Sequence, residues 1–323
     1  MNKKKCIVIT TINPVNKCLE AFSNLEGWDL IIVGDKKSPS SYNGIKAIYL
    51  DLAKQNELFP KFSEVMPYNH YCRKNLGYLY AIKEGYEIIG ESDDDNFPYN
   101  NWGEFPSAES FSTIVEPEFP NVYKEFTNLN IWPRGFPLDS ILSGEEIKSQ
   151  ELPAQVFVWQ GLADGDADVD AIYRLTVNRN VKFKKSKAIV LNKGIFSPFN
   201  SQNTLWQKSA RVFLYLPHTV TFRYTDILRA FVAQAGIWAR GGSLGFLSPT
   251  VSSEERNSHN LLKDFEDEIP MYQSFHKVIE TLKNSKIEGR DEDLLVLYEA
   301  LAKNNIVEAS ELKSIKSWLQ TAL

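Results

Sequence analysis

Three consecutive carboxylates, Asp93-Asp94-Asp95, form the cluster whose residue types most clearly indicate chemistry. They follow Tyr86–Ile89, a short apolar run typical of a buried strand. Adjacent carboxylates repel one another, and each is costly to desolvate without a counter-charge. At the carboxyl end of a parallel strand, where ligands bind in open α/β sheets, the natural counter-charge is a divalent cation. We therefore expect the triplet to bind Mn²⁺ or Mg²⁺, with a solvated acidic loop as the alternative.

Polar side chains also follow two other predicted strands, Lys5–Thr10 and Trp28–Val33, and open a predicted helix over residues 68–85. Because these ends meet at one edge of a parallel sheet, we expect them to form a nucleotide cradle around the acids. Taken singly, the same residues are explained as an N-cap, a turn and a surface charge. The cradle residues are Thr10, Thr11, Asn13, Asp35 and the run Arg73-Lys74-Asn75.

Other phosphate-handling sites have no support in the sequence. The first strand is followed by Thr11-Ile12-Asn13, which lacks the nucleophilic Asp of an aspartyl-phosphate phosphatase. Neither the P-loop pattern nor the Gly-x-Gly-x-x-Gly pattern of dinucleotide-binding folds occurs. A metal-held nucleotide diphosphate suits the acid cluster better than a phosphate cradled by glycines.

The spacing of apolar residues predicts the elements that position these groups. The first 95 residues alternate strands and helices, with a helix from Asn13-Pro14 to Phe22 and a third strand over Ile45–Leu50. This order favours a mostly parallel sheet with right-handed crossovers. Residues 97–150 are rich in Pro, Asn, Ser and Phe and have the composition of functional loops. Later elements are strands at Gln155–Gln160 and Ala188–Leu191, a helix at Tyr224–Ala239 ended by Gly241-Gly242, and helices at Leu261–Lys286, Asp291–Asn304 and Ala309–Leu323.

The composition limits the class of protein. Of 323 residues, 43% are hydrophobic and 24% charged, as in a globular protein. A net charge of −5 gives no broad attraction to phosphate polymers, so we expect no nucleic-acid partner. Three cysteines without metal-ligand spacing indicate a reducing compartment. No window approaches the ~20 apolar residues of a membrane span, so we expect a cytoplasmic protein that can still dock on a membrane.

A series of different short motifs runs along the chain to about residue 265. With these motifs the sequence resembles the STELLO family of glycosyltransferases. More distantly it resembles the plant UDP-arabinopyranose mutases (reversibly glycosylated polypeptides), which share the acid triplet. The motifs include Ile9-Thr-Thr-Ile-Asn-Pro14, Val33-Gly-Asp-Lys-Lys37, Tyr71-Cys-Arg-Lys-Asn-Leu76, Glu91-Ser-Asp-Asp-Asp-Asn96, Ile131-Trp-Pro-Arg-Gly-Phe136, Gln160-Gly-Leu-Ala-Asp164, Asn200-Ser-Gln-Asn-Thr-Leu205 and Thr225-Asp-Ile-Leu-Arg229.

The resemblance implies a GT-A fold over residues 1–260, with a C-terminal helical region over residues 261–323. It implies an Asp-x-Asp metal element at Asp93 and Asp95, and nucleotide contacts at Arg73 and Asn75. Asp94 is assigned a supporting role at the donor site. His259 matches a family motif and could complete the metal shell, or it is a loop histidine bonded to backbone.

The function that the resemblance implies is transfer of a sugar from a nucleotide diphosphate-sugar, most simply a UDP-sugar, to a glycan acceptor. Two alternatives stay open: a non-catalytic scaffold of a polysaccharide synthase complex and a sugar-nucleotide mutase. An inverting transferase needs a general base, for which we predict Asp226, at the start of a strongly amphipathic helix. Arg223 and Arg229 beside it could orient that carboxylate or meet a phosphate.

Two further stretches carry weaker expectations. Asp164, Asp166, Asp168 and Asp170 alternate as in a calcium loop, but the downstream Gly and Glu positions fail. An acceptor-binding or loop-ordering role, with Asp170 and Arg174 paired, is the better interpretation. Residues 132–136 form either a mobile acceptor loop or a packed turn.

Overall fold

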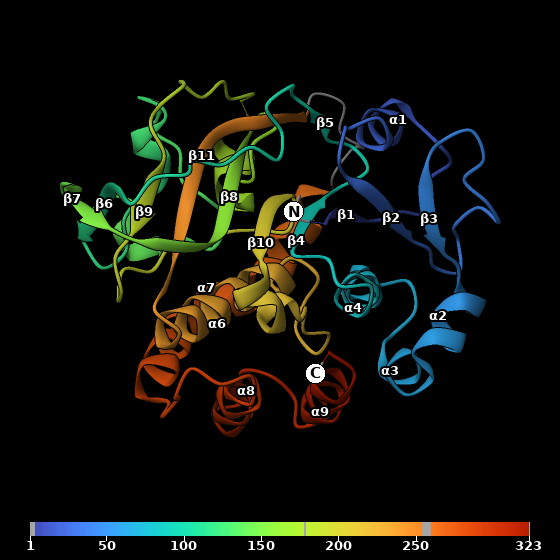
Figure 1. Ribbon diagram of the computed structural model, residues 1–323. Coiled ribbons are helices and arrows are strands. Elements are labelled where there is room, and N and C mark those ends of the chain that lie inside the picture. Colours follow the sequence, from blue (N-terminus) through green and yellow to red (C-terminus); the bar gives the residue numbers. More distant parts are fainter. Residues whose placement is uncertain (1–3, 178, 254–259, 323) are drawn as a thin grey trace.

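The computed structural model describes residues 4–177, 179–253 and 260–322, and shows one large twisted sheet with helices on both faces (Figure 1). The long path through the sheet has the following strand order: β3 (Ala47–Leu50), β2 (Asp29–Val33), β1 (Lys5–Thr10), β4 (Ile88–Ser92), β10 (Asn203–Gln207), β8 (Gln155–Gly165), β11 (Gly242–Ser253), β9 (Ile189–Leu191), β6 (Ser110–Glu116) and β7 (Lys148–Pro153). The short β5 (Phe97–Pro98) pairs with β11.

The mixed α/β class is confirmed, but the sheet is not mostly parallel. Within the described residues, five strand pairings are parallel and five are antiparallel. The parallel half at β3, β2, β1 and β4 is the part that the sequence predicted. The reversal occurs at β10, which runs antiparallel between β4 and β8, with Asn203 opposite Ser92. Because β10 begins where β4 ends, the loop before β10 lies beside the acid triplet.

Each face of the sheet has its own apolar core. Along β1, Cys6 and Val8 belong to one core, and Ile7 and Ile9 to the other, as expected for alternating side chains of a strand. The helices are α1 (Lys17–Ser23), α2 (Leu52–Leu58), α3 (Pro60–Val65), α4 (Lys74–Lys83), α5 (Ala171–Thr176), α6 (Thr225–Ala239), α7 (Leu261–Asn284), α8 (Asp293–Lys303) and α9 (Glu311–Ala322).

Two predicted helices begin later than expected. The helix expected from Pro14 begins instead at Lys17, because the Asn16 side chain accepts the N–H groups of Cys18 and Leu19. The helix expected over residues 68–85 is a short 3₁₀ turn, Tyr71–Arg73, followed by α4. Gly85, with φ of 74°, closes α4 as predicted.

The C-terminal helices share a core with the rest of the chain. Helix α7 packs on α5 and α6, and α9 packs on α3 and α4 (Figure 1). The fully buried Trp318 of α9 donates its indole N–H to the Val212 carbonyl at 3.0 Å. The domain boundary at residue 260 stays a prediction. No helix in the described part of the chain is long and apolar enough to cross a membrane.

A fully buried ion pair joins α6 to the centre of the sheet. Arg229 contacts Glu91 of β4 at 2.8 Å, and both side chains are excluded from solvent. Glu91 also accepts hydrogen bonds from Tyr78 and Trp206, and Arg229 lies over the Trp206 ring. The expectation that Arg229 serves the site directly is therefore not met, since its guanidinium faces the core.

We predict that Arg229→Ala lowers the free energy of unfolding by about 3–5 kcal/mol, because it leaves the Glu91 carboxylate buried without a counter-charge. Urea unfolding measures the change. The matched control is Lys148→Ala, which removes a solvent-exposed pair with Glu116 and should leave the unfolding midpoint nearly unchanged. Equal effects in the two variants would contradict the argument.

Candidate active site

A cleft of about 270 Å³ opens at the carboxyl ends of β1 and β4. Its walls come from seven segments: the ends of β1 and β4, the turn at Tyr71, the turn at Arg134, the loop after β8, the loop before β10 and the chain that enters α6. It brings together three of the predicted donor-site acids, the predicted base and Thr10. The lining residues are Thr10, Tyr71, Asp93, Asp94, Asp95, Arg134, Asp168, Asn200, Ser201, Gln202, Phe222, Arg223 and Asp226.

The middle acid of the triplet is bound by the loop between β1 and α1. The carboxylate of Asp94 accepts hydrogen bonds from the Thr11 hydroxyl and, at 2.8 Å, from the Asn13 amide. The Asn16 amide donates to the Asp94 carbonyl at 2.9 Å. Thr11 and Asn13 therefore hold the triplet in place. We expected Asp94 to bond sugar hydroxyls or backbone, but its carboxylate is held by two side chains, and its role at a donor site stays a prediction.

Lys74, the middle residue of the predicted cradle run Arg73-Lys74-Asn75, contacts the triplet. Its ammonium lies 3.3 Å from Asp93 and donates to the carbonyls of Ser92 and Ser201 at 2.7 and 3.1 Å. Desolvation in the cleft raises the pKa of Asp93 to about 7; Lys74 opposes this rise, and the nearby carboxylates of Asp95, Asp94 and Asp226 add to it.

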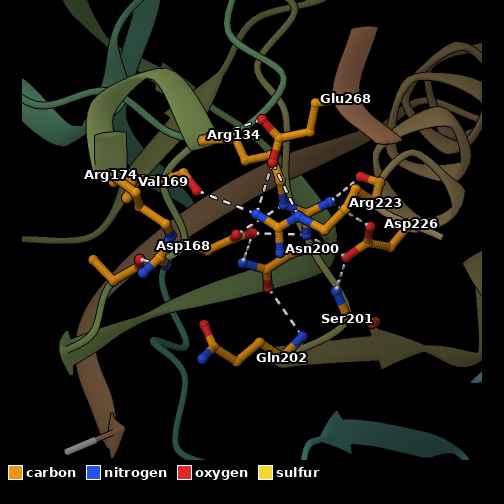
Figure 2. Close-up of polar contacts among 12 residues, drawn as sticks. Arg134, Asp168, Val169, Arg174, Asn200, Ser201, Gln202, Arg223, Asp226 and Glu268 are labelled. Carbon is orange, nitrogen blue, oxygen red and sulfur yellow. Dashed lines mark hydrogen bonds and ion pairs between the residues drawn. The ribbon is translucent and has the colours of Figure 1, made fainter. Parts of the chain in front are cut away.

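Arg134 lies between two carboxylates on the opposite side of the cleft, as Figure 2 shows. Its guanidinium bonds Asp168 at 2.8 and 3.0 Å and Asp226 at 2.9 Å to each oxygen. Asn200 donates to Asp168 at 2.8 Å, and the Ser201 N–H donates to Asp226 at 3.2 Å. Three distant segments are therefore held together by one cation with two paired anions.

This pairing sets the basicity of Asp226. Burial alone would raise the pKa of Asp226, but the charge and hydrogen bonds of Arg134 outweigh burial and hold it below the ordinary value. The same balance lowers the pKa of Asp168. A carboxylate with a lowered pKa is a weaker general base. The assignment of Asp226 as the base stays a prediction.

The backbone around Arg134 is packed, which favours the packed turn over the mobile loop. Trp132 is buried and donates its indole N–H to Asp170 at 2.6 Å. Gly135 has φ of 87°, and a Cβ there would lie 2.4 Å from the Ile227 side chain on α6. Only glycine satisfies both conditions.

The Asp164–Asp170 stretch orders the loop, though with different partners from those expected. Arg174 pairs with Asp166, not with Asp170. Asp170 instead caps α5 by accepting the Tyr173 N–H at 2.8 Å. Desolvation, with the nearby Glu268 charge, raises the pKa of Asp170 to about 6 against the opposing hydrogen bonds. The expected pair fails because Asp170 faces into the α5 N-terminus.

Two predicted nucleotide contacts, Arg73 and Asn75, lie outside the cleft. Arg73 is buried, and its guanidinium bonds Gln55, Ser63 and the Met66 carbonyl. Asn75 is buried and exchanges two hydrogen bonds of 2.8 Å with the Leu216 backbone. Both side chains have structural partners and do not reach the cleft.

Two other predicted residues stay untested. Asp35 is half-buried at the end of β2, beside the cleft, and accepts the N–H groups of Lys36 and His70. His259 lies outside the described residues, so its predicted role as a metal ligand has no structural counterpart here.

The cleft also contains residues that the analysis by residue type missed. Tyr71 and Phe222 meet edge to face with ring centroids 4.6 Å apart, and Phe222 is exposed. Asn200 and Ser201 belong to a motif that carried the family resemblance but was given no role. Their polar side chains, in a family motif just before a strand, were the sequence signal for a place in the site.

The described residues of the cleft supply only some of the ligands that a metal ion needs. Among residues 4–177, 179–253 and 260–322, no three His, Cys, Asp or Glu side chains cluster closely enough to hold an ion by themselves. Asp93 and Asp95 offer hard oxygen ligands from one loop. This set fits Mg²⁺ or Mn²⁺, which bind through one or two carboxylates and take further oxygens from substrate phosphates.

Comparisons with known proteins found one family model and two similar proteins. A family model described as STELLO glycosyltransferases matches residues 223–322, which include Arg223, Asp226 and the C-terminal helices. Two proteins of Arabidopsis thaliana match nearly the whole chain. "Probable glycosyltransferase STELLO2" is 28% identical over 99% of this chain and 45% of its own length. "Probable glycosyltransferase STELLO1" is 26% identical over 98% of this chain and 44% of its own length.

The resemblance to STELLO glycosyltransferases is thereby confirmed over nearly all of the chain. The chain spans less than half of the length of either relative. Both relatives are named as probable glycosyltransferases.

We predict that Asp93→Asn stabilises the metal-free protein more at pH 8 than at pH 5. The folded-state pKa of about 7 exceeds the ordinary 3.8, so the folded state holds the proton more tightly. That contribution is complete below the ordinary value and is lost as pH rises through about 7. The neutral amide removes this loss. Urea unfolding with chelator present measures it.

The matched control is Glu57→Gln, an exposed carboxylate on α2. It should change the unfolding midpoint little at either pH. A stabilisation by Asp93→Asn that is the same at pH 5 and pH 8 would contradict the raised pKa.

Proposed function

We propose that this chain is a metal-dependent glycosyltransferase of the GT-A type. It transfers a sugar from a nucleotide diphosphate-sugar, with a UDP-sugar as the first choice, to a glycan acceptor with inversion. The observation that carries the proposal is the cleft, which is lined by five carboxylates and two guanidinium groups at the carboxyl end of β4. Such an excess of negative charge favours a bound cation, in a chain similar to named glycosyltransferases.

The donor half of the cleft is the acid triplet. In the proposal Asp93 and Asp95 hold Mn²⁺ or Mg²⁺, which when bound neutralises the diphosphate leaving group. His259 is a further candidate ligand. Lys74 offsets part of the repulsion between the carboxylates, and Thr11 and Asn13 fix the loop through Asp94. Thr10 lines the same wall and is available to the nucleotide.

The acceptor half is the Arg134 network. Asp226 lines the cleft, and in the proposal it takes the proton of the acceptor hydroxyl. Arg134 and the Ser201 N–H orient its carboxylate. Its lowered pKa favours one other candidate, a sugar-nucleotide mutase, because ring-form interconversion requires no acceptor to be deprotonated.

We predict that Asp93→Ala and Asp95→Ala each abolish the Mn²⁺-dependent binding of UDP, because each removes one of two carboxylate ligands. Isothermal titration calorimetry with UDP, GDP and other nucleotides, with and without Mn²⁺, measures the affinity. Asp139→Ala, in the exposed turn Leu138–Ser140, is the matched control and should bind like the unaltered protein.

Two results would count against this donor site. Retained metal-dependent affinity in both variants would remove the metal assignment. Absence of binding by the unaltered protein to every nucleotide, with metal present, would favour the non-catalytic scaffold.

We predict that Asp226→Asn lowers the transfer rate at least ~10²-fold while nucleotide and metal binding stay intact, because the amide keeps the shape and loses the basicity. Single-turnover assays with a screened sugar nucleotide measure the rate. Asp168→Asn is the matched control, since it loosens the same guanidinium without touching the proposed base.

The two variants separate a base from a positioning group. An equal loss in both would mean that Asp226 acts only through Arg134. Near-normal turnover in Asp226→Asn would transfer the role to another carboxylate or indicate a retaining mechanism. Ring-form interconversion of the donor without any acceptor would favour the mutase.

A further inference from the structure

The segment between α5 and β9 has a charge opposite to that of the chain as a whole. Residues 179–187, here called the basic strip, contain five cations and no Asp or Glu, although the net charge of the protein is −5. All five side chains are exposed. Within the described residues, none of them makes a hydrogen bond or an ion pair. The cations are Arg179, Lys182, Lys184, Lys185 and Lys187.

The strip is held against the sheet by its backbone. Val181 exchanges two hydrogen bonds of 2.7 Å with Gly165 at the end of β8. The Phe183 N–H donates to Asp164 at 2.9 Å, and the Ser186 N–H donates to the Ser248 hydroxyl at 2.8 Å. The segment is therefore fixed in place, and it is visible as the yellow-green trace that leads into β9 (Figure 1).

Side chains of the strip alternate between buried and exposed positions. Val181 and Phe183 are buried, whereas Lys182 and Lys184 point outward, as expected for extended chain. Phe183 packs on Tyr123 with ring centroids 5.1 Å apart. The cations consequently lie on the outer surface, and the buried Val181 and Phe183 anchor the strip beneath them.

Exposed apolar side chains lie next to the strip in the chain. Leu175 and Val177 are 44% and 45% exposed, and they immediately precede the first cation at Arg179. Stable binding at a lipid surface takes two contributions, basic side chains that attract anionic headgroups and apolar side chains that insert among the lipids. An acidic polysaccharide would satisfy the cations but has no apolar interior for Leu175 and Val177.

We propose that the basic strip, with Leu175 and Val177, docks this protein on an anionic lipid bilayer. The strip lies close to the cleft. The Tyr123 ring that packs on Phe183 also donates its hydroxyl to the Asp168 carbonyl at 3.0 Å. Docking through the strip therefore brings the cleft near the bilayer surface. The proposal stands independently of the sugar-transfer reaction.

Vesicle co-sedimentation tests the proposal on the full chain. We expect binding to phosphatidylserine-rich vesicles at low salt, loss of binding at high salt, and no binding to pure phosphatidylcholine vesicles. Neutralising three lysines of the strip should weaken vesicle binding roughly 100-fold, because each lysine near an anionic surface strengthens binding roughly five-fold. The strip variant combines Lys182→Gln, Lys184→Gln and Lys185→Gln.

The matched control removes the same charge from exposed positions on α8 and α9 near the C-terminus, and it should bind vesicles as the unaltered protein does. Leu175→Ser should weaken binding at low salt while leaving its salt dependence in place. Thermal unfolding midpoints of all variants should be unchanged, because the altered side chains are exposed. The control combines Lys303→Gln, Lys313→Gln and Lys316→Gln.

Three outcomes would overturn the proposal. The control variant could lose as much binding as the strip variant, which would mean that net charge alone decides. The protein could bind neutral and anionic vesicles equally. It could also bind the acidic polysaccharide polygalacturonate through the strip lysines and ignore vesicles, which would make the strip a polysaccharide surface.

Discussion

The structure of the cleft depends on one guanidinium. Arg134 is buried between Asp168 and Asp226, and its hydrogen bonds to both offset the cost of burying two carboxylates in one place. Each partner belongs to a different part of the chain: the turn before Gly135, the loop after β8 and the first turn of α6. An unpaired charge in this position would be strongly destabilising, so the three segments must meet for the fold to close.

A second buried pair fixes the direction from which α6 reaches that network. Arg229 lies three residues after Asp226 and binds Glu91, one residue before the end of β4. Helix α6 is therefore attached to the sheet beneath the cleft by one charge and to the cleft wall by another. The acid triplet begins two residues after Glu91. The acid triplet and the Arg134 network are consequently tied to the same strand and helix.

The electrostatics of the cleft follow from which cations are already engaged. Arg134 is shared by two carboxylates, and Arg223 is paired with Glu268. Lys74 contacts Asp93 but also donates to two backbone carbonyls. Burial in the cleft raises the pKa of Asp93, and the neighbouring carboxylates of Asp95, Asp94 and Asp226 raise it further against the charge of Lys74. The closeness of these carboxylates in one cleft is the physical basis for the proposed cation.

The sequence by itself determined the local features: the alternation of β1, the position of the acid triplet after a buried strand, the amphipathic α6 and the C-terminal helices. Those depend on residue periodicity and on contacts close in the chain. Tertiary structure alone decided the reversal at β10, the choice of Lys74 over Arg73 as the cation facing the acids, and the pairing of Arg134 with Asp226. The last pair is separated by 92 residues. Local periodicity carries no information on such a distance, since the meeting of two buried charges is set by how whole elements pack.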